Sequence, residues 1–217
     1  KSYLFGTILV ERITDVFALF IFILLGIFFI PSDLLINLSK ELGTSLNLIY
    51  FFLYSLGFSI ILFIFLQLEK VRNIFLKFIP KFSFFNKKID SIINSFFKGV
   101  FTLEKNKLFN ILILAITIWI IEFSMFYIVE TQLNLNLNNT FLAILFFGVF
   151  ANLSGIIPST SGGWGPFELI GTIVLVSFGA DREIAAAFTI IVHLILWLPI
   201  SIIGLFCFLF DLRNKRI

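Results

Sequence analysis

Residues 141–178 read FLAILFFGVFANLSGIIPSTSGGWGPFELIGTIVLVSF: an apolar run, a break rich in Ser, Gly and Pro at 158–166, and a second apolar run. The second run, 167–178, is too short to span a membrane, because a transmembrane helix needs about 20 apolar residues. Paired segments interrupted by Gly and Pro are typical of broken or re-entrant helices, which lie at membrane depth only when buried in protein or lining a wet cavity. The stretch predicts either a re-entrant hairpin or two short spans.

The composition of the whole chain indicates an integral membrane protein. Of its 217 residues, 59% are hydrophobic and 13% are charged, whereas a soluble domain has about 25% charged residues. A soluble core could not absorb this much Phe, Ile and Leu without leaving large apolar patches exposed. We therefore expect an all-α, polytopic transmembrane helical bundle that forms a single membrane domain over 1–217. The apolar sequence begins directly after Lys1, so we also expect upstream helices to be missing.

Four other apolar stretches predict the helices around the break, at 3–30, 46–67, 108–129 and 184–210. Each is long enough to cross about 30 Å of hydrocarbon as a helix. The shorter polar stretches between them are expected to be loops, including the one at 130–140.

Residues 68–107 form the one extended polar connection, with nine Lys or Arg against three Asp or Glu. Apolar residues at helical spacing within it predict an amphipathic helix that lies flat on the membrane surface. The positive-inside rule places this basic segment, and the basic tail after Phe210, in the cytoplasm. We expect a multi-pass protein of the cell's inner (plasma) membrane.

The first polar cluster inside an apolar span is Glu11-Arg12-Ile-Thr-Asp15. On a helix Asp15 lies one turn beyond both Glu11 and Arg12, so the Arg can be shared between two carboxylates. A charge at the centre of a span costs about 2.5–3.5 kcal/mol, so we expect the cluster to face the protein interior. The alternative is a structural ion network, or side chains that snorkel to the surface where the span begins.

The loop at 158–168 is the second candidate. Gly162, Gly163 and Gly165 free the backbone to expose its N–H groups, and Pro166 suits the first turn of a helix whose positive dipole end would point into the loop. An anion such as a lipid phosphate could bind there. Glu168 in the same turn would satisfy the dipole and repel a phosphate unless protonated or paired, so a proton or cation site is equally consistent. The loop could also merely let two half-helices pack.

His193 and Glu122 are the remaining candidates within predicted spans. His193 is either a hydrogen-bonded interior residue or part of a site, and Pro199 removes one helical hydrogen bond and should kink the span near it. Glu122 is either a neutral acid bonded to a neighbouring helix or a member of the same site.

Metal and catalytic sites have no support in the sequence. The single cysteine, Cys207, rules out an intramolecular disulfide and a cysteine cage, and the single His gives a His-based metal centre no support. There is no G-x-x-x-x-G-K-[ST], H-E-x-x-H or G-x-S-x-G motif. We expect no cofactor, no metal, no enzymatic activity and no nucleic-acid partner.

Three motifs resemble one known family. The run Glu11-Arg12-Ile-Thr-Asp15 with Ala18-Leu19 is similar to the E-R-x-x-D-x-x-A-L element of the lysylphosphatidylglycerol synthase transmembrane-region family, also called flippase-like or UPF0104. The loop motif of this family is a Pro followed by G-G-x-G-x-x-E. The sequence resembles it at Pro158, Gly162, Gly163, Gly165 and Glu168. Trp119 to Glu122 fits its W-x-x-E span. The resemblance covers essentially the whole chain, with His193 where many members have an Arg.

The resemblance implies a lipid translocase that moves a phospholipid or a polyprenyl-type glycolipid between leaflets. Glu168, Glu122, His193 and the Glu11-Arg12-Asp15 cluster would converge on a polar cavity for the head group. Anionic phospholipid or polyprenyl-linked lipid, a membrane-associated synthase or glycosyltransferase, and further copies in a homo-oligomer are the expected partners. Some relatives carry a soluble aminoacyl transferase after the membrane part, and here only seven residues follow Phe210.

Two other functions stay open. A proton- or ion-coupled small-solute transporter is favoured by the acids, the His and the broken helices. A non-transporting membrane subunit would instead dock a lipid-modifying or glycosyl-transferring enzyme.

Overall fold

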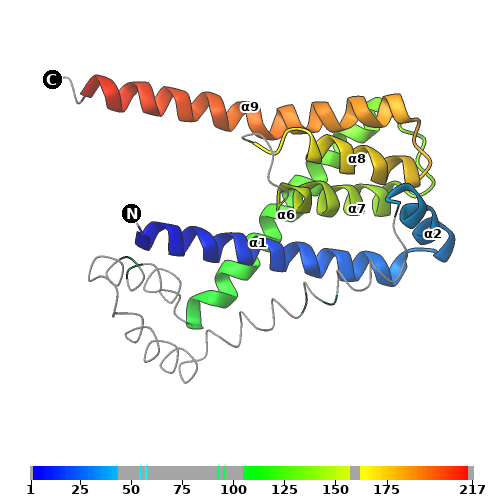
Figure 1. Cartoon of the computed structure of the whole chain (residues 1–217), viewed down its shortest axis with the longest axis horizontal. Helices are drawn as coiled ribbons and strands as arrows, with labels where there is room; N and C mark the ends of the chain where they lie inside the picture. Colours follow the sequence, from blue (N-terminus) through cyan, green and yellow to red (C-terminus); the bar gives the residue numbers. More distant parts are fainter. Residues whose placement is uncertain are drawn as a thin grey trace. The chain divides into compact units, whose positions relative to one another are not determined.

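The computed structural model describes residues 2–43, 105–156 and 162–214, with isolated positions at 54, 57, 92 and 95. The described ranges are built from helices joined by short turns, and they contain no strand. The helices are α1 (Ser2–Phe29), α2 (Ser32–Glu41), α6 (Lys105–Leu133), α7 (Thr140–Leu153), the 3₁₀ turn η2 (Ser154–Ile156), α8 (Pro166–Ser177) and α9 (Arg182–Asn214), as Figure 1 shows. The all-α prediction is confirmed. The predicted span 46–67 and the segment 68–107 lie outside the described residues, apart from the isolated positions and residues 105–107, which begin α6.

Three of these helices are long and apolar enough to cross a membrane, over Ser2–Phe29, Phe109–Leu133 and Arg182–Asp211. They coincide with three of the predicted spans, and the helical membrane class is confirmed. α6 runs further than expected, to Leu133, so the first residues of the predicted loop 130–140 are helical. The reason is that Glu130 continues the helix as a buried residue instead of ending it at the surface.

The described chain divides into two compact units, which we treat separately. The first comprises residues 1–24 and 47–121, and the second comprises 25–46 and 122–217. Val10, Ala18 and Trp119 are among the buried residues of the first unit. The expectation of a single membrane domain stays a prediction.

In the second unit α8 packs against α7, α9 and α2 (Figure 1). α7 and α8 form an antiparallel hairpin whose tip is the Gly-rich break. With 14 and 12 residues, they are about 21 and 18 Å long at 1.5 Å per residue. Both are shorter than the hydrocarbon core, which is about 30 Å thick.

An aromatic core holds the helices of the second unit together. The ring of Phe147 on α7 makes edge contacts with Phe126 of α6, Phe167 of α8 and Phe188 of α9, at centroid distances of 5.4, 5.9 and 5.1 Å. All four rings are buried. Edge-to-face pairs add about 0.5–1.5 kcal/mol each beyond the burial of their area, so Phe147 is the residue that ties the four helices to one another.

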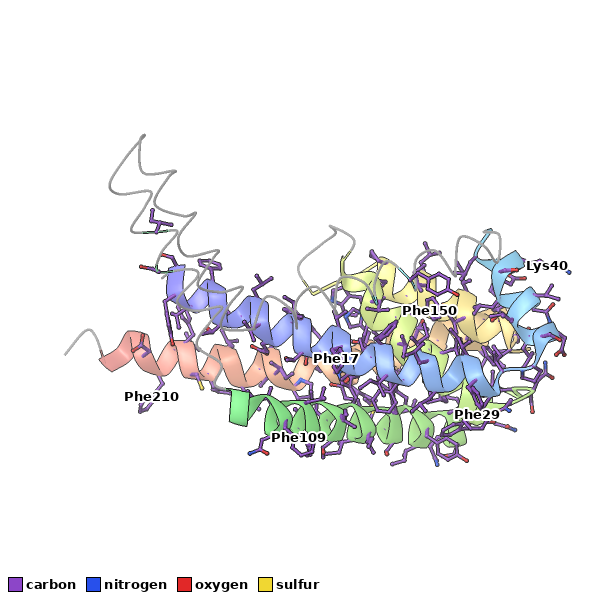
Figure 2. The ribbon with its side chains drawn as sticks, turned by 90° about the horizontal axis from the view of Figure 1, so that it is seen from below. Phe17, Phe29, Lys40, Phe109, Phe150 and Phe210 are labelled. Atoms are coloured by element: carbon purple, nitrogen blue, oxygen red, sulfur yellow. The ribbon has the colours of Figure 1, made fainter. Side chains whose placement is uncertain are left out.

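Apolar side chains also cover the outside of the long helices. Phe109 on α6 and Phe210 on α9 project from their ribbons in Figure 2 and are 68% and 67% exposed. From Pro199 to Phe210 every side chain of α9 is exposed except the half-buried Ser201. In a helix that crosses a membrane, such a surface suits contact with lipid chains.

Gly171 permits the close approach of three helices. A Cβ added there would lie 2.7 Å from Cε2 of Phe147 on α7 and 2.8 Å from Cγ2 of Thr189 on α9. Small residues at membrane helix interfaces let the backbones come this close. Next to this contact, the hydroxyl oxygens of Thr172 and Thr189 lie 3.3 Å apart and link α8 to α9.

Gly171→Ala is expected to lower the free energy of unfolding by about 1–3 kcal/mol, because the new methyl group overpacks this contact. Gly204→Ala is the matched control, since Gly204 also lies inside a helix and no described atom is within 4 Å of its added Cβ. Unfolding by SDS titration in micelles, followed by circular dichroism, measures both. Equal losses in the two variants would contradict the packing described here.

Candidate functional site

The tip of the α7–α8 hairpin depends on glycine. Gly162, Gly163 and Gly165 have φ values of +89°, +78° and +101°, a region that residues with a Cβ rarely occupy. α8 begins directly afterwards at Pro166, as the Pro position predicted. Pro158, the other predicted loop residue, lies outside the described residues.

Glu168 satisfies the first turn of its own helix. Its Oε2 accepts a hydrogen bond from the backbone N–H of Gly165 at 2.6 Å, which is one half of a capping box. A phosphate that used this N–H would first have to displace the carboxylate. The arrangement therefore favours the hypothesis that the loop binds a proton or a cation over the hypothesis that it binds an anion.

The other oxygen of Glu168 contacts His193, which lies 25 residues later on α9. Oε1 is 2.5 Å from Nδ1 of His193, and the ring's Nε2 is 2.9 Å from the carbonyl oxygen of Gly162. A single imidazole thus joins the loop before α8, the first turn of α8 and the middle of α9. The His193 side chain is 6% exposed and that of Glu168 is 18% exposed.

The hydrogen-bond pattern fixes the charge of this pair. The Gly162 carbonyl can only accept, so Nε2 of His193 carries a proton. The contact between Nδ1 and Oε1 then needs one more proton, held by either the nitrogen or the oxygen. In both cases Glu168 and His193 together are neutral. A neutral, fully bonded pair is the form in which ionisable groups tolerate burial.

Aromatic rings enclose the imidazole. Trp164 stacks on His193 at a centroid distance of 4.3 Å and 20° between planes, and Phe167 lies 4.4 Å away at 37°. Trp164 also meets Trp197 edge-on at 6.3 Å. Because Phe167 contacts Phe147 as well, the site is attached directly to the aromatic core.

Trp164, Phe167 and Trp197 were not among the predicted site residues. The abundance of Phe, 32 residues in this chain, hides the few aromatic residues that have a particular contact. Trp is rare in this chain, and its positions were the usable signal. Of the three Trp residues, Trp164 lies among the loop glycines and Trp197 lies one turn after His193.

His193 sits well inside the candidate span of α9. It is 11 residues beyond Arg182, the start of that span, which corresponds to about 17 Å along the helix axis. The hairpin tip therefore meets α9 near the middle of its span, and this geometry favours a re-entrant hairpin. α9 continues as one helix through Pro199 to Asn214.

The Glu11-Arg12-Asp15 cluster belongs to the first unit. Arg12 lies 3.5 Å from a carboxylate oxygen of Glu11 and 3.5 Å from one of Asp15, so the Arg is shared as predicted. The side chains of Arg12 and Glu11 are 69% and 61% exposed, and only Asp15 is half-buried. The expectation that the whole cluster faces the interior is wrong for Arg12 and Glu11. The long side chains project outward while the shorter Asp stays against the helix, as in snorkelling.

Two acids lie on the part of α6 that belongs to the second unit. Glu122 is half-buried, one turn before the core residue Phe126. Glu130, which was predicted only as a loop residue, is 6% exposed. The structure brings Glu168, His193 and Gly162 together, and the convergence of Glu122 and of the Glu11-Arg12-Asp15 cluster on them stays a prediction.

The long apolar helices and the short hairpin, with the Glu168–His193 contact at its tip, define a multi-pass helical membrane protein. Residues 1–204 match the family described as the lysylphosphatidylglycerol synthase TM region, and the chain belongs to that family. It is similar to a UPF0104 membrane protein of Methanocaldococcus jannaschii, with 29% identity over 215 residues, which are 96% of this chain and 82% of the relative. No solved structure matches the chain. The resemblance drawn from the three motifs is confirmed.

Proposed function

We propose that this chain is a lipid translocase, which moves a phospholipid or a polyprenyl-type glycolipid between leaflets with its head group at the hairpin tip. The observation that carries the proposal is the Glu168–His193 contact, covered by protein and placed near the middle of the α9 span. Ionisable residues at membrane depth are costly and mark substrate or ion pathways. Non-helical backbone at that depth is tolerated where it is buried or lines a wet cavity.

Apolar side chains beside the pair support a lipid over a fully polar solute. Leu194 follows His193 and Leu198 lies one turn further along α9, and both are exposed. A head group could therefore reach the polar tip while its acyl chains stay in the bilayer against these residues.

The surroundings of the site complete the proposal. Basic residues of 68–107 would hold anionic lipids at the cytoplasmic surface, at about 1 kcal/mol per Lys or Arg. We place the protein in the inner membrane, with this segment and the C-terminus in the cytoplasm, and we propose no catalytic step. A separate synthase or glycosyltransferase would supply or use the lipid, and further copies of the chain are possible partners in a homo-oligomer.

Lipid movement in proteoliposomes tests the function. Glu168→Gln should slow the transfer of fluorescently labelled phosphatidylglycerol between leaflets at least tenfold, a change of about 1.4 kcal/mol in the barrier. The amide keeps the size of the side chain and breaks the proton arrangement with His193. Gly163→Leu should have a similar effect, because its φ of +78° does not suit a branched side chain.

Glu183→Gln is the matched control, since Glu183 is an exposed acid on the first turn of α9. It should move lipid at the rate of the unchanged protein. Equal rates in all four proteins would remove the loop from the mechanism. Co-purification with a transferase, together with no lipid movement by the unchanged protein, would favour the docking subunit instead.

A coupled small-solute transporter is the second candidate, and the protonatable Glu168–His193 pair is the observation that favours it. Uptake of a solute driven by a pH gradient, in vesicles where labelled lipid does not move, would support this function over lipid translocation.

A further inference from the structure

We propose that the proton shared by Glu168 and His193 is the coupling ion for lipid movement, bound from one side of the membrane and released to the other once per lipid. This inference rests on the proposed translocase function and adds its source of energy. It follows from the number of protons that the contact can hold, the absence of other protonatable groups on the pair's own helices between Ile184 and Phe206 of α9 and along α8, and what the loss of the proton does to the loop.

The exchangeable proton lies in the contact between Nδ1 of His193 and Oε1 of Glu168. The proton on Nε2 is held by the Gly162 carbonyl, so it is not the one released. When the shared proton leaves for water, its bond to Nδ1 or Oε1 breaks and the pair changes from neutral to singly negative. Two acceptors then face each other without a hydrogen between them.

Loss of the proton therefore converts an attraction between α8 and α9 into a repulsion. His193 keeps its bond to Gly162, and Glu168 keeps its bond to Gly165. The link that opens is the one that holds the first turn of α8 against the middle of α9. The bound proton thus favours the arrangement in which the hairpin tip is held against α9, and its loss favours the arrangement in which this contact is open. A coupled transporter requires its ion site to shift such an equilibrium.

The pair is isolated from other protonatable groups on its own helices. α7 has none, α8 has only Glu168, and α9 has only His193 between Ile184 and Phe206; residues 157–161, read from the sequence alone, have none either. The other elements of the second unit that pack on these helices carry Asp33, Lys40 and Glu41 on α2 and Glu122, Tyr127 and Glu130 on α6. A proton bound on the hairpin or on this part of α9 is therefore bound by the pair.

Coupling can be tested by imposing a tenfold proton gradient across proteoliposomes that contain labelled phosphatidylglycerol. If one proton moves with each lipid, the gradient shifts the steady-state ratio of label between leaflets by up to about tenfold, and a reversed gradient shifts it the other way. The double variant Glu168→Gln/His193→Gln can still donate amide N–H groups but leaves the pair without a titratable group, so label in its vesicles should reach the same ratio under both gradients. Glu183→Gln should behave as the unchanged protein does.

The possible failures are distinguishable. Lipid that moves but distributes identically under both gradients would overturn the coupling and leave the translocase standing. A response of Glu168→Gln/His193→Gln equal to that of the unchanged protein would show that the coupling ion binds elsewhere, which also overturns the inference. Labelled lipid that does not move at all, with or without a gradient, would overturn the translocase and the coupling together.

Discussion

His193→Leu lowers the free energy of unfolding by about 3–5 kcal/mol, the loss expected when one partner of a buried pair is removed. Leucine fills a similar volume, but it leaves Oε1 of Glu168 without its hydrogen-bond partner and the carbonyl of Gly162 without its donor. The stacked ring of Trp164 also loses its partner. Equilibrium unfolding in micelles, followed by circular dichroism, measures the loss.

The double variant Glu168→Leu/His193→Leu tests whether Glu168 and His193 stabilise the protein as a pair. Replacing both partners of a buried pair by apolar residues can be close to neutral, so the double variant should be more stable than His193→Leu alone. A double variant that loses the sum of the two single losses would show that Glu168 and His193 act independently.

Phe147→Ala is expected to lower the free energy of unfolding by about 3–5 kcal/mol, since it leaves a cavity among four helices. Phe147 is fully buried and contacts one aromatic ring from each of α6, α8 and α9. Phe210→Ala is the matched control, because Phe210 is 67% exposed near the end of α9. The control should change stability by no more than about 0.5 kcal/mol. Comparable losses in both variants would contradict a core centred on Phe147.

Much of the fold could be predicted because the bilayer imposes a length on its helices. Long apolar runs located α1, α6 and α9, and Gly and Pro located the break between α7 and α8. Helix ends were harder, as at Glu130, where a buried acid continues α6 through residues that were predicted as a loop. A single charged residue does not reveal whether it ends a helix at the surface or lies covered by neighbouring helices.

The candidate site could be predicted only in part. The types of residue in the loop were equally consistent with an anion site and with a proton or cation site, and Glu168 and His193 were both named. Spacing along the chain could not show that the two meet, because they lie on different helices. Nor could it show that Trp164 covers the imidazole, or that Arg12 and Glu11 are exposed. Those outcomes depend on how helices pack, which periodicity within one helix does not specify.

The central claim is that the hairpin tip forms a wet polar site inside the membrane, and the reactivity of a cysteine at Leu169 tests it most directly. Cys207 is the only cysteine in the chain, so Cys207→Ser gives a clean background. A membrane-impermeant thiol reagent reacts only where water can form the thiolate. Two further variants give reference reactivities. Ile203→Cys, on the exposed apolar half of α9, gives the reactivity of a position that faces lipid, and Asp181→Cys, in the turn before α9, gives that of a position in water.

We predict that Leu169→Cys reacts with the reagent from one side of the membrane only, more slowly than Asp181→Cys and faster than Ile203→Cys. A cysteine at 169 as unreactive as that at 203, or as reactive as that at 181, would contradict a wet site at membrane depth.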